Sequence, residues 1–222
     1  MSQTAFNSHL LGDNSAWPLG KLVCVGRNYA EHAAELNNPL PEQPLLFIKP
    51  ATSAVAMQNP VHLPEGAGDV HYETEIALLI GNRLNKAPPQ EALEAVIGVG
   101  LALDLTLRDL QTELKKQGHP WERAKAWDGA CPLSSFVPAC EVKDWQELEL
   151  SLAINGIEKQ RGKAKQMLTP IAELLSHISQ TFTLLPGDVV ITGTPAGVGK
   201  LVSGDQLDVK LTGLLQVNTQ VV

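Results

Sequence analysis

Short apolar runs separated by turn-forming residues dominate the chain, and they predict a protein built mainly from β-strands. Residues 21–26, 45–49 and 188–193 are largely apolar runs of the length that buried strands have. Residues 70–81 alternate between polar and apolar at first and then become uniformly apolar, which predicts a strand that enters the core from the surface. Residues 98–105 form a further predicted strand.

The second half of the chain is richer in β-strand signals than the first. Residues 148–154 run directly into Asn155-Gly156, and this dipeptide is typical of a two-residue turn between antiparallel strands. Two more short strands are predicted on either side of Thr212-Gly213, where the chain approaches its end.

Helical periodicity is confined to a few segments. The helices are predicted at residues 29–38, 88–98, 106–118 and 170–182. Asn28 can cap the first of them, and Thr106 can cap the third, which Gly118 ends. Proline stands at the start of the second and the fourth, where a missing backbone N–H costs nothing.

Many short strands with few, scattered helices indicate a β-rich α+β fold. A regular alternation of strands and helices does not occur, so a doubly wound parallel sheet is disfavoured. No internal repeat, low-complexity tract or Gly/Ser-rich linker marks a boundary between domains. We therefore expect one domain over residues 21–222, preceded by a polar lead-in at residues 1–20.

Composition restricts the partners of the chain. The 24 acidic and 17 basic residues give a formal net charge of −7, and no basic block is present, so binding to nucleic acid or to an anionic membrane is not expected. No apolar stretch approaches the roughly 18 residues that suggest a membrane span, and the N-terminus has no signal-peptide pattern. The cysteines, Cys24, Cys131 and Cys140, fit no disulfide framework. These features predict a soluble, cytoplasmic protein.

Glu73 and Glu75 are the most informative local feature of the sequence. Residues two apart on a strand share a face and lie about 7 Å apart along the chain, so both carboxylates can converge on one hard cation. An isolated Glu-x-Glu pair is usually a solvated strand face. Here the strand continues into the apolar residues 76–81, where two acids on one face repel each other unless a cation or a base compensates them.

Asp104 ends the most apolar stretch of the chain and fits two roles. It can cap the helix that follows Thr106, or it can serve as a third ligand beside Glu73 and Glu75. Three carboxylates without Cys or His nearby indicate Mg²⁺ or Mn²⁺ rather than zinc. Three protein ligands leave about three positions of an octahedral ion for water or substrate, so such a site would be open for chemistry.

His32 and Glu35 lie three residues apart on the first predicted helix and therefore on one face. A carboxylate that holds an imidazole fixes its tautomer and raises its basicity, which a general base for water requires. The same spacing also fits an ordinary surface pair. Because surface ion pairs are common and mostly inert, the residues alone favour that interpretation.

Positive charge lies near the acidic cluster in sequence. Arg108 and Gln111 share a face of the helix directly after Asp104 and are candidates to contact a ligand, whereas Lys115, in the last turn, is expected to act on the helix dipole. Further cations beside apolar segments are Arg27, Lys49 and Lys125. A divalent ion would leave the three carboxylates with a residual negative charge, so an anionic ligand needs such cations nearby.

A glycine-rich stretch at residues 193–200 follows a predicted strand. It lacks the spacing of a phosphate-binding loop and that of a dinucleotide-binding turn. It is better explained as a tight loop that brings Thr194 and backbone N–H groups towards a carboxylate.

A set of motifs in a fixed order identifies a resemblance to a known family. The motifs are VCVGRNYAEHAAE, PLLFIKPATS, VHYETEIALLIG, LALDLTLRDLQ, PWERAKAWDGACP and GDVVITGTPAGVG. Together they resemble the fumarylacetoacetate hydrolase superfamily, and within it the acylpyruvate hydrolase branch. The resemblance runs from about residue 21 to the end of the chain.

The resemblance implies a β-rich α+β core with a short helical lid, usually found as a homodimer. It implies that Glu73, Glu75 and Asp104 hold Mg²⁺ or Mn²⁺. His32 and Glu35 match the catalytic dyad of the lid, which reverses the preference for a surface pair.

The family's substrate contacts match Arg27, Arg108, Gln111, Lys125 and Thr194 of this chain. One departure is AKAW, where relatives often carry AKSF or AKAF, so Trp127 is expected to reshape the pocket and with it the choice of substrate.

The activity implied by the resemblance is metal-dependent hydrolysis of a carbon–carbon bond. A small 2-oxo acid of the acylpyruvate type would be cleaved to pyruvate and a carboxylic acid, with His32 as the base for water and with Lys125 and Gln111 stabilising the developing oxyanion. The alternative at the same metal site is tautomerisation or decarboxylation of oxaloacetate, or isomerisation of an unsaturated 2-oxo diacid. A metal-stabilised binding protein without catalysis is disfavoured, because the expected coordination sphere is open.

Overall fold

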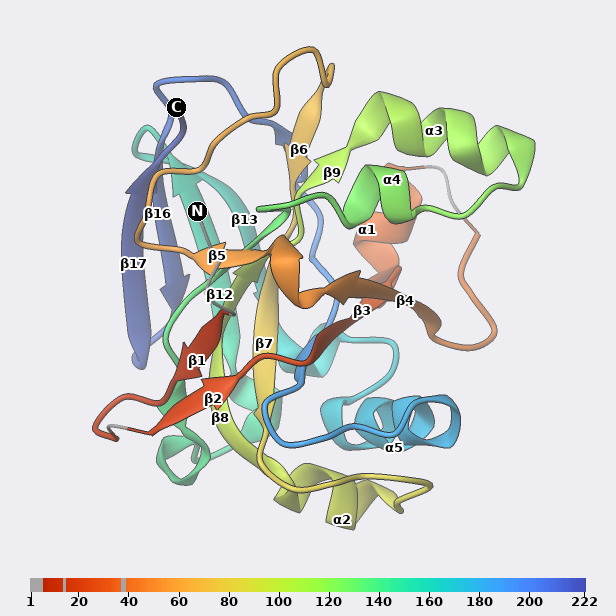
Figure 1. The fold of residues 1–222 in the computed structure, drawn as a ribbon, viewed down its shortest axis with the longest axis vertical. Helices are drawn as coiled ribbons and strands as arrows, with labels where there is room; N and C mark the ends of the chain where they lie inside the picture. Colours follow the sequence, from red (N-terminus) through yellow and green to blue (C-terminus); the bar gives the residue numbers. More distant parts are fainter. Residues whose placement is uncertain (1–5, 14, 37–38) are drawn as a thin grey trace.

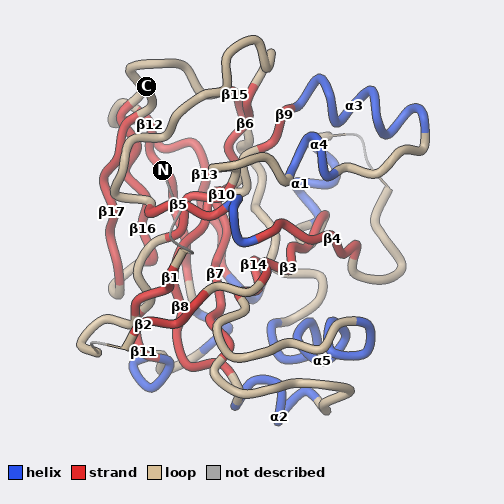
Figure 2. The backbone as a smooth tube through the Cα atoms, viewed as in Figure 1, coloured by secondary structure: helices blue, strands red, loops and turns tan. Residues whose placement is uncertain are grey.

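Strands contribute more residues than helices, and the helices lie around them (Figures 1 and 2). The structure is a computed structural model that describes residues 6–13, 15–36 and 39–222. The helices are α1 (Ala30–Glu35), α2 (Pro89–Glu94), α3 (Arg108–Gln117), α4 (Glu122–Lys125) and α5 (Ile171–Thr181). The strands are β1 (Asn7–His9), β2 (Ala16–Pro18), β3 (Lys21–Gly26), β4 (Leu45–Pro50), β5 (Ala54–Ala56), β6 (Val70–Tyr72), β7 (Thr74–Ile80), β8 (Val96–Leu103), β9 (Thr106–Leu107), β10 (Cys131–Leu133), β11 (Val137–Pro138), β12 (Glu149–Ile154), β13 (Ile157–Lys163), β14 (Val189–Ile191), β15 (Gly199–Lys200), β16 (Gln206–Leu211) and β17 (Leu215–Gln220).

The largest sheet is mixed and runs in the order β4-β3-β14-β7-β8-β10-β5, with β11 paired to β8. Its strands β14 and β3 are parallel, as are β10 and β5, while the remaining neighbours are antiparallel. Such a mixed sheet with peripheral helices confirms the predicted α+β class. No regular strand–helix alternation of a doubly wound fold is seen in the described residues.

Strand β7 explains why the alternation in the sequence disappears after Glu75. Ile76, Leu78 and Ile80 pack into one hydrophobic cluster, while Ala77 and Leu79 pack into a second one. Since successive side chains of a strand point to opposite faces, both faces of this part of the sheet are buried. A strand buried on both faces needs apolar residues at every position.

A second sheet, β13-β12-β16-β17, is antiparallel and lies on the side of the molecule opposite α3 (Figure 1). Asn155 and Gly156 join β12 to β13 with positive φ angles of 52° and 79°, as the predicted tight turn requires. The second predicted hairpin, around Thr212-Gly213, joins β16 to β17.

All four predicted helices form, but the second is shorter than predicted, because residues 96–98 belong to β8 and not to α2. Two of the predicted caps are also wrong. Asn28 does not cap α1, because its side chain instead donates to the carbonyl of Thr192 at 2.9 Å and accepts the backbone N–H of Thr169. Thr106 lies in β9, and α3 begins at Arg108 without a side-chain cap. Gly118 ends α3 in the left-handed conformation, as predicted.

The first helix was predicted to reach residue 38. In the structure α1 ends at Glu35, and residues 37–38 lie outside the described residues. No helix in the described ranges is long and apolar enough to cross a membrane.

The polar lead-in contains structure of its own. Strands β1 and β2 form an antiparallel pair, and Leu10 bridges to Phe136 of the main body. Residues 1–5 and 14 of the lead-in lie outside the described residues. The described part of the lead-in therefore packs onto the main body.

Candidate active site

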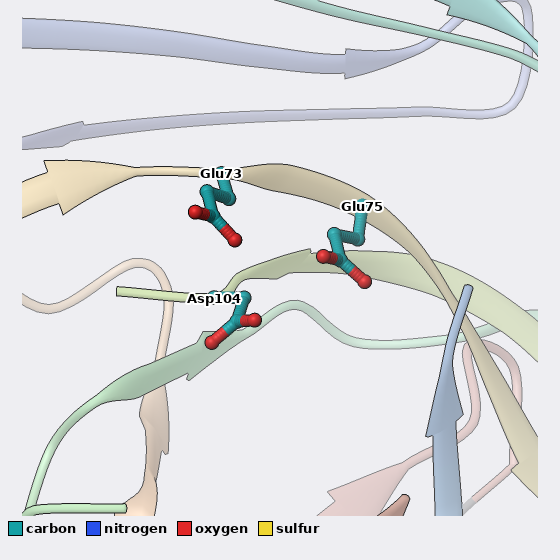
Figure 3. A group of neighbouring side chains, drawn as sticks. All are labelled: Glu73, Glu75 and Asp104. Atoms are coloured by element: carbon teal, nitrogen blue, oxygen red, sulfur yellow. The ribbon is translucent and has the colours of Figure 1, made fainter. Parts of the chain in front are cut away.

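Three buried carboxylates converge at the ends of β6, β7 and β8 (Figure 3). Glu73 lies in the break between β6 and β7, and Glu75 points to the same side two residues later. The antiparallel register pairs Glu75 with Ala102, and the N–H of Asp104 donates to the carbonyl of Glu73 at 2.8 Å. This register brings Asp104 beside the two glutamates, so that oxygen atoms of all three lie within 4.8 Å of one another.

Lysine side chains neutralise much of this acidic cluster. Nζ of Lys125 lies 2.8 Å from Glu73 and 2.7 Å from Oδ2 of Asp104. Nζ of Lys49 lies 2.8 Å from Oδ1 of Asp104, and Arg108 forms an ion pair with Glu73. Each oxygen of Asp104 therefore has its own lysine.

Glu75 is the one carboxyl group of the three that forms no ion pair with a described residue. Burial, followed by repulsion from Asp104 and Glu73, raises the pKa of Glu75 well above its usual range. Burial also opposes ionisation of Glu73, but the charges of Lys125 and Arg108 outweigh it and hold the pKa of Glu73 below its usual range. Burial opposes the charge of Lys125 as well, yet Asp104 and Glu73 raise its pKa.

The cluster fits a hard divalent cation. All three groups offer carboxylate oxygen, the donor that Mg²⁺ and Mn²⁺ prefer. Glu75 accepts the backbone N–H of Gly193 at 2.7 Å, but this bond and the charge of Lys125 do not outweigh its burial and the repulsion from the neighbouring acids. A divalent cation would supply the missing positive charge.

A pocket opens above the carboxylates between α1, α3 and β4. It is lined by Val25, Gly26, Arg27, His32, Leu36, Leu45, Phe47, Glu73, Glu75, Arg108, Gln111, Lys115, Trp121, Lys125 and Thr194. The wall thus includes every residue for which sequence and resemblance predicted a substrate contact. Asp104 lies beneath Lys125 and is not part of the wall.

His32 and Glu35 are close but do not form a short hydrogen bond. Nδ1 of His32 lies 3.5 Å from Oε2 of Glu35, and both oxygens of Glu35 accept the N–H of Gly197 at 3.1 Å. Burial lowers the pKa of His32 from its ordinary value of 6.5, although Glu73 and Glu35 oppose this. The lowered pKa favours the neutral imidazole, which is the form that can accept a proton.

The glycine-rich loop contacts carboxylates through its backbone, as predicted. The N–H of Gly193 reaches Glu75, and that of Gly197 reaches Glu35. The side chain of Thr194 behaves differently: its hydroxyl donates to the carbonyl of Thr74 at 2.8 Å and accepts from the amide of Gln160. Thr194 lines the pocket while its hydroxyl is held by the sheet.

The structure gives Lys49 and Lys115 a larger part in the site than the sequence predicts, and it places Trp127 outside the pocket wall. Lys49 is named only as a cation beside an apolar segment, yet it is fully buried against Asp104. Lys115, assigned to the helix dipole, lines the pocket. Trp127, expected to reshape the pocket, packs against the hydrophobic core and is not among the lining residues. Each of these positions depends on how distant segments pack, which no local pattern encodes.

Comparisons with known proteins place the chain among enzymes of one family. Residues 21–222 match the family model described as fumarylacetoacetate (FAA) hydrolase C-terminal. The chain is 49% identical over 198 residues to the oxaloacetate tautomerase YcgM of Escherichia coli K12, covering 89% of this chain and 90% of that protein. It is 38% identical over 206 residues to the mitochondrial oxaloacetate tautomerase FAHD1 of Homo sapiens, covering 92% and 93%.

A solved structure agrees with the fold. The crystal structure of fumarylpyruvate hydrolase from Pseudomonas aeruginosa, in complex with Mn²⁺ and pyruvate, superposes with a TM-score of 0.94 at 35% identity. The superposition covers 100% of this chain and 97% of that one.

Proposed function

The chain belongs to the fumarylacetoacetate hydrolase family, and from this premise we propose that it is a divalent-metal-dependent tautomerase that interconverts the keto and enol forms of oxaloacetate. The observation that carries the proposal is the buried Glu73, Glu75 and Asp104 cluster beneath a pocket lined by cations. The similarity to two oxaloacetate tautomerases supports this reaction over the hydrolysis that the motifs first indicated.

Glu73, Glu75 and Asp104 would hold Mg²⁺ or Mn²⁺. When bound, such an ion acts as a Lewis acid that stabilises negative charge developing on the 2-oxo group. Bound there, it would also balance the charge of Glu75, whose pKa is raised by burial and by the acidic neighbours.

The side chains of the pocket bind and orient the substrate. Arg108 is braced by Gln111, whose side-chain oxygen lies 2.7 Å from the guanidinium, and both face the pocket. A guanidinium in a fixed orientation suits the carboxylate of a 2-oxo acid. Lys125 lies beside Phe47, with Nζ 5.2 Å from the ring centre, and can donate to the oxygen that gains charge.

His32 would move the proton. As a buried, neutral imidazole on the pocket wall it can accept a proton from the carbon next to the 2-oxo group and return it. Glu35, with Oε2 3.5 Å from Nδ1 of His32, would orient the ring through its charge, and the N–H of Gly197 holds Glu35 in place. Burial also removes bulk water from around the ring, which limits unwanted proton exchange.

The test is a direct measurement of tautomerisation. Ultraviolet absorbance of the enol form is followed as oxaloacetate equilibrates, with the protein stripped of metal and then supplied with Mg²⁺ or Mn²⁺. We expect metal-dependent acceleration that Glu73→Gln reduces by at least a hundredfold, on the scale of losing an essential ligand. No acceleration with either ion would refute the proposal.

A second candidate is hydrolysis of acylpyruvates, favoured by the similarity to a fumarylpyruvate hydrolase and by the His32–Glu35 pair. Water activation needs such a base. Release of pyruvate from acetylpyruvate or fumarylpyruvate distinguishes the two reactions. Pyruvate release faster than oxaloacetate tautomerisation under the same conditions would make hydrolysis the main activity.

A further inference from the structure

Thr74, between the two glutamates of the cluster, lies beyond the end of the strand that pairs with this edge of β7. The N–H of Asp104 donates to the carbonyl of Glu73 at 2.8 Å, and in an antiparallel ladder the next residue turns its own N–H and C=O to the opposite edge. The strand on that edge is β14, whose pairing with β7 ends where Ile191 meets Ala77. Thr74 therefore needs other partners, because a buried backbone group without one costs about as much free energy as a lost hydrogen bond.

A side chain from the second sheet supplies those partners. Gln160 lies in β13 and is 1% exposed, and its amide oxygen accepts the N–H of Thr74 at 3.0 Å. Its amide nitrogen donates to the hydroxyl of Thr194 at 2.8 Å and to the carbonyl of Pro195 at 2.9 Å. The hydroxyl of Thr194 in turn donates to the carbonyl of Thr74 at 2.8 Å. These hydrogen bonds form a closed ring at the residue that links the two glutamates.

A β-bulge aims Gln160 at this position. The register of β13 against β12 passes from Gln160 to Glu158 over two successive residues of β12, so Lys159 is an extra residue in β13. Bulges of this kind redirect a side chain and are frequent beside active sites. The glycine-rich loop lies directly on the bulge, because a Cβ on Gly197 would be 2.0 Å from the carbonyl oxygen of Lys159. Gln160 therefore reaches β7 and the loop at the same time.

The ring supports both glutamates of the cluster. Thr74 joins them in the chain, so its backbone sets the positions from which Glu73 and Glu75 extend. The loop that Gln160 holds begins with Gly193, whose N–H is bonded to Glu75 at 2.7 Å. A carboxamide suits this place, because it offers donors and an acceptor together and adds no charge to a cluster of three acids.

Resting on the metal site of the proposed function, we propose that Gln160 is a positioning residue for the divalent cation, although it is not part of the pocket wall. Through Thr74 it holds Glu73 and Glu75 in their converging arrangement. Through Thr194 it fixes the loop that bonds Glu75. Without the carboxamide the N–H of Thr74 is buried and unpaired, and the strand shifts to find another partner. The metal site is then weaker, although all three of its ligands are present.

The test measures the dissociation constant of Mn²⁺ by calorimetry, in the absence of substrate. Gln160→Met keeps the length of the side chain and removes its donors and its acceptor. We expect the dissociation constant to rise about tenfold, the lower end of the effect of removing a group that supports a metal ligand. Ser179→Ala is the matched control, because the buried hydroxyl of Ser179 accepts the N–H of Ala87 at 3.0 Å and donates to the carbonyl of Ser176 at 2.8 Å, outside the pocket wall. This control should leave the dissociation constant of Mn²⁺ unchanged.

Thr194→Val interrupts the same ring from its other side, and it decides the question if Gln160→Met does not fold. Valine keeps nearly the shape of threonine and lacks the hydroxyl, so the dissociation constant of Mn²⁺ should again rise about tenfold. Because both side chains act through Thr74, the double variant should bind Mn²⁺ about as well as either single variant. Independent effects would instead multiply to a rise of about a hundredfold.

An unchanged dissociation constant in Gln160→Met, or in Thr194→Val if the first variant does not fold, would overturn the inference. A rise of about a hundredfold in the double variant, or an equal rise in Ser179→Ala, would overturn it as well. A wild-type protein that binds neither Mn²⁺ nor Mg²⁺ would refute it together with the proposed function. A wild-type protein that binds Mn²⁺ without accelerating tautomerisation would refute the proposed function alone, and the dissociation constants would still decide the role of Gln160.

Discussion

Replacing Lys49 by Met is expected to lower the free energy of unfolding of the metal-free protein by about 3 kcal/mol. Met has nearly the same length, so packing is retained while the charge and the donors disappear. Nζ of Lys49 is fully buried, lies 2.8 Å from Oδ1 of Asp104, and donates to the carbonyls of Leu105 at 3.2 Å and Ala130 at 2.8 Å. The carbonyl of Ala130 keeps a second donor, the N–H of Leu105, so its loss is small.

The remaining losses set the magnitude. The carbonyl of Leu105 loses a donor, at about 1 kcal/mol, and Asp104 loses a charged partner, at about 2 kcal/mol. The total of about 3 kcal/mol lies at the lower end of the range of about 3–5 kcal/mol for breaking a buried ion pair from one side. Asp104 keeps Lys125 at 2.7 Å, which explains why the higher values are not expected.

Urea denaturation of the wild type and the variant measures this difference. Lys21→Met is a matched control, because Lys21 begins the neighbouring strand β3 and also pairs with a buried aspartate, Asp188. Its side chain is 25% exposed, so water can replace part of the lost interaction, and a loss of about 1 kcal/mol is expected. A loss below about 1 kcal/mol for Lys49→Met, or one no larger than that of Lys21→Met, would refute the reasoning.

Three further predictions concern the site. Because burial lowers the pKa of His32 from 6.5 and the neutral ring is the base, turnover should fall on acidification with a midpoint below pH 6.5. A pH profile of turnover with its acidic midpoint at or above pH 6.5 would contradict this assignment. Glu75→Gln should raise the melting temperature of the metal-free protein by a few degrees, because it removes a buried charge that its neighbours repel. The same substitution should abolish the stabilisation that Mn²⁺ gives the wild type, and thermal scans with and without Mn²⁺ measure both effects. Gly197→Ala should lower turnover about tenfold or more, because a Cβ there would lie 2.0 Å from the carbonyl of Lys159 and displace the N–H that holds Glu35; unchanged turnover in a folded variant would show that Glu35 needs no such support.

The parts of the fold that the sequence predicted well are those whose signals are local. The turn at Asn155-Gly156 forms because these two residues tolerate positive φ angles, whatever surrounds them. The glutamates two apart share a face because strand geometry alone requires it, and Asp104 joins them because antiparallel pairing of two adjacent strands brings it there. The periodicity of the strands and the antiparallel pairing of β7 with β8 are therefore sufficient to predict that the three metal-ligand candidates lie together.

The mistaken predictions concern side chains that have a choice of partners. Asn28 satisfies the rules for a helix cap, but in the folded chain it joins the backbones of Thr169 and Thr192, more than a hundred positions away. Lys49 looks like an ordinary end of a strand until β4 pairs with β3 and places its ammonium group under Asp104. In both cases long-range packing decides between alternatives that are equal in the sequence.

Lys49 also changes the electrostatic argument that the composition suggests. The net charge of −7 and the three converging acids predict that the site stays negative after a divalent ion binds. In the folded chain each carboxylate oxygen of Asp104 has a lysine, and Arg108 and Lys125 share Glu73, so the same ion leaves the pocket positive. Because the cations lie within a buried, weakly screened region, their effect on a small dianion exceeds that of the more numerous acids on the surface. The local excess of positive charge, opposite in sign to the charge of the protein as a whole, suits the pocket to a small anion.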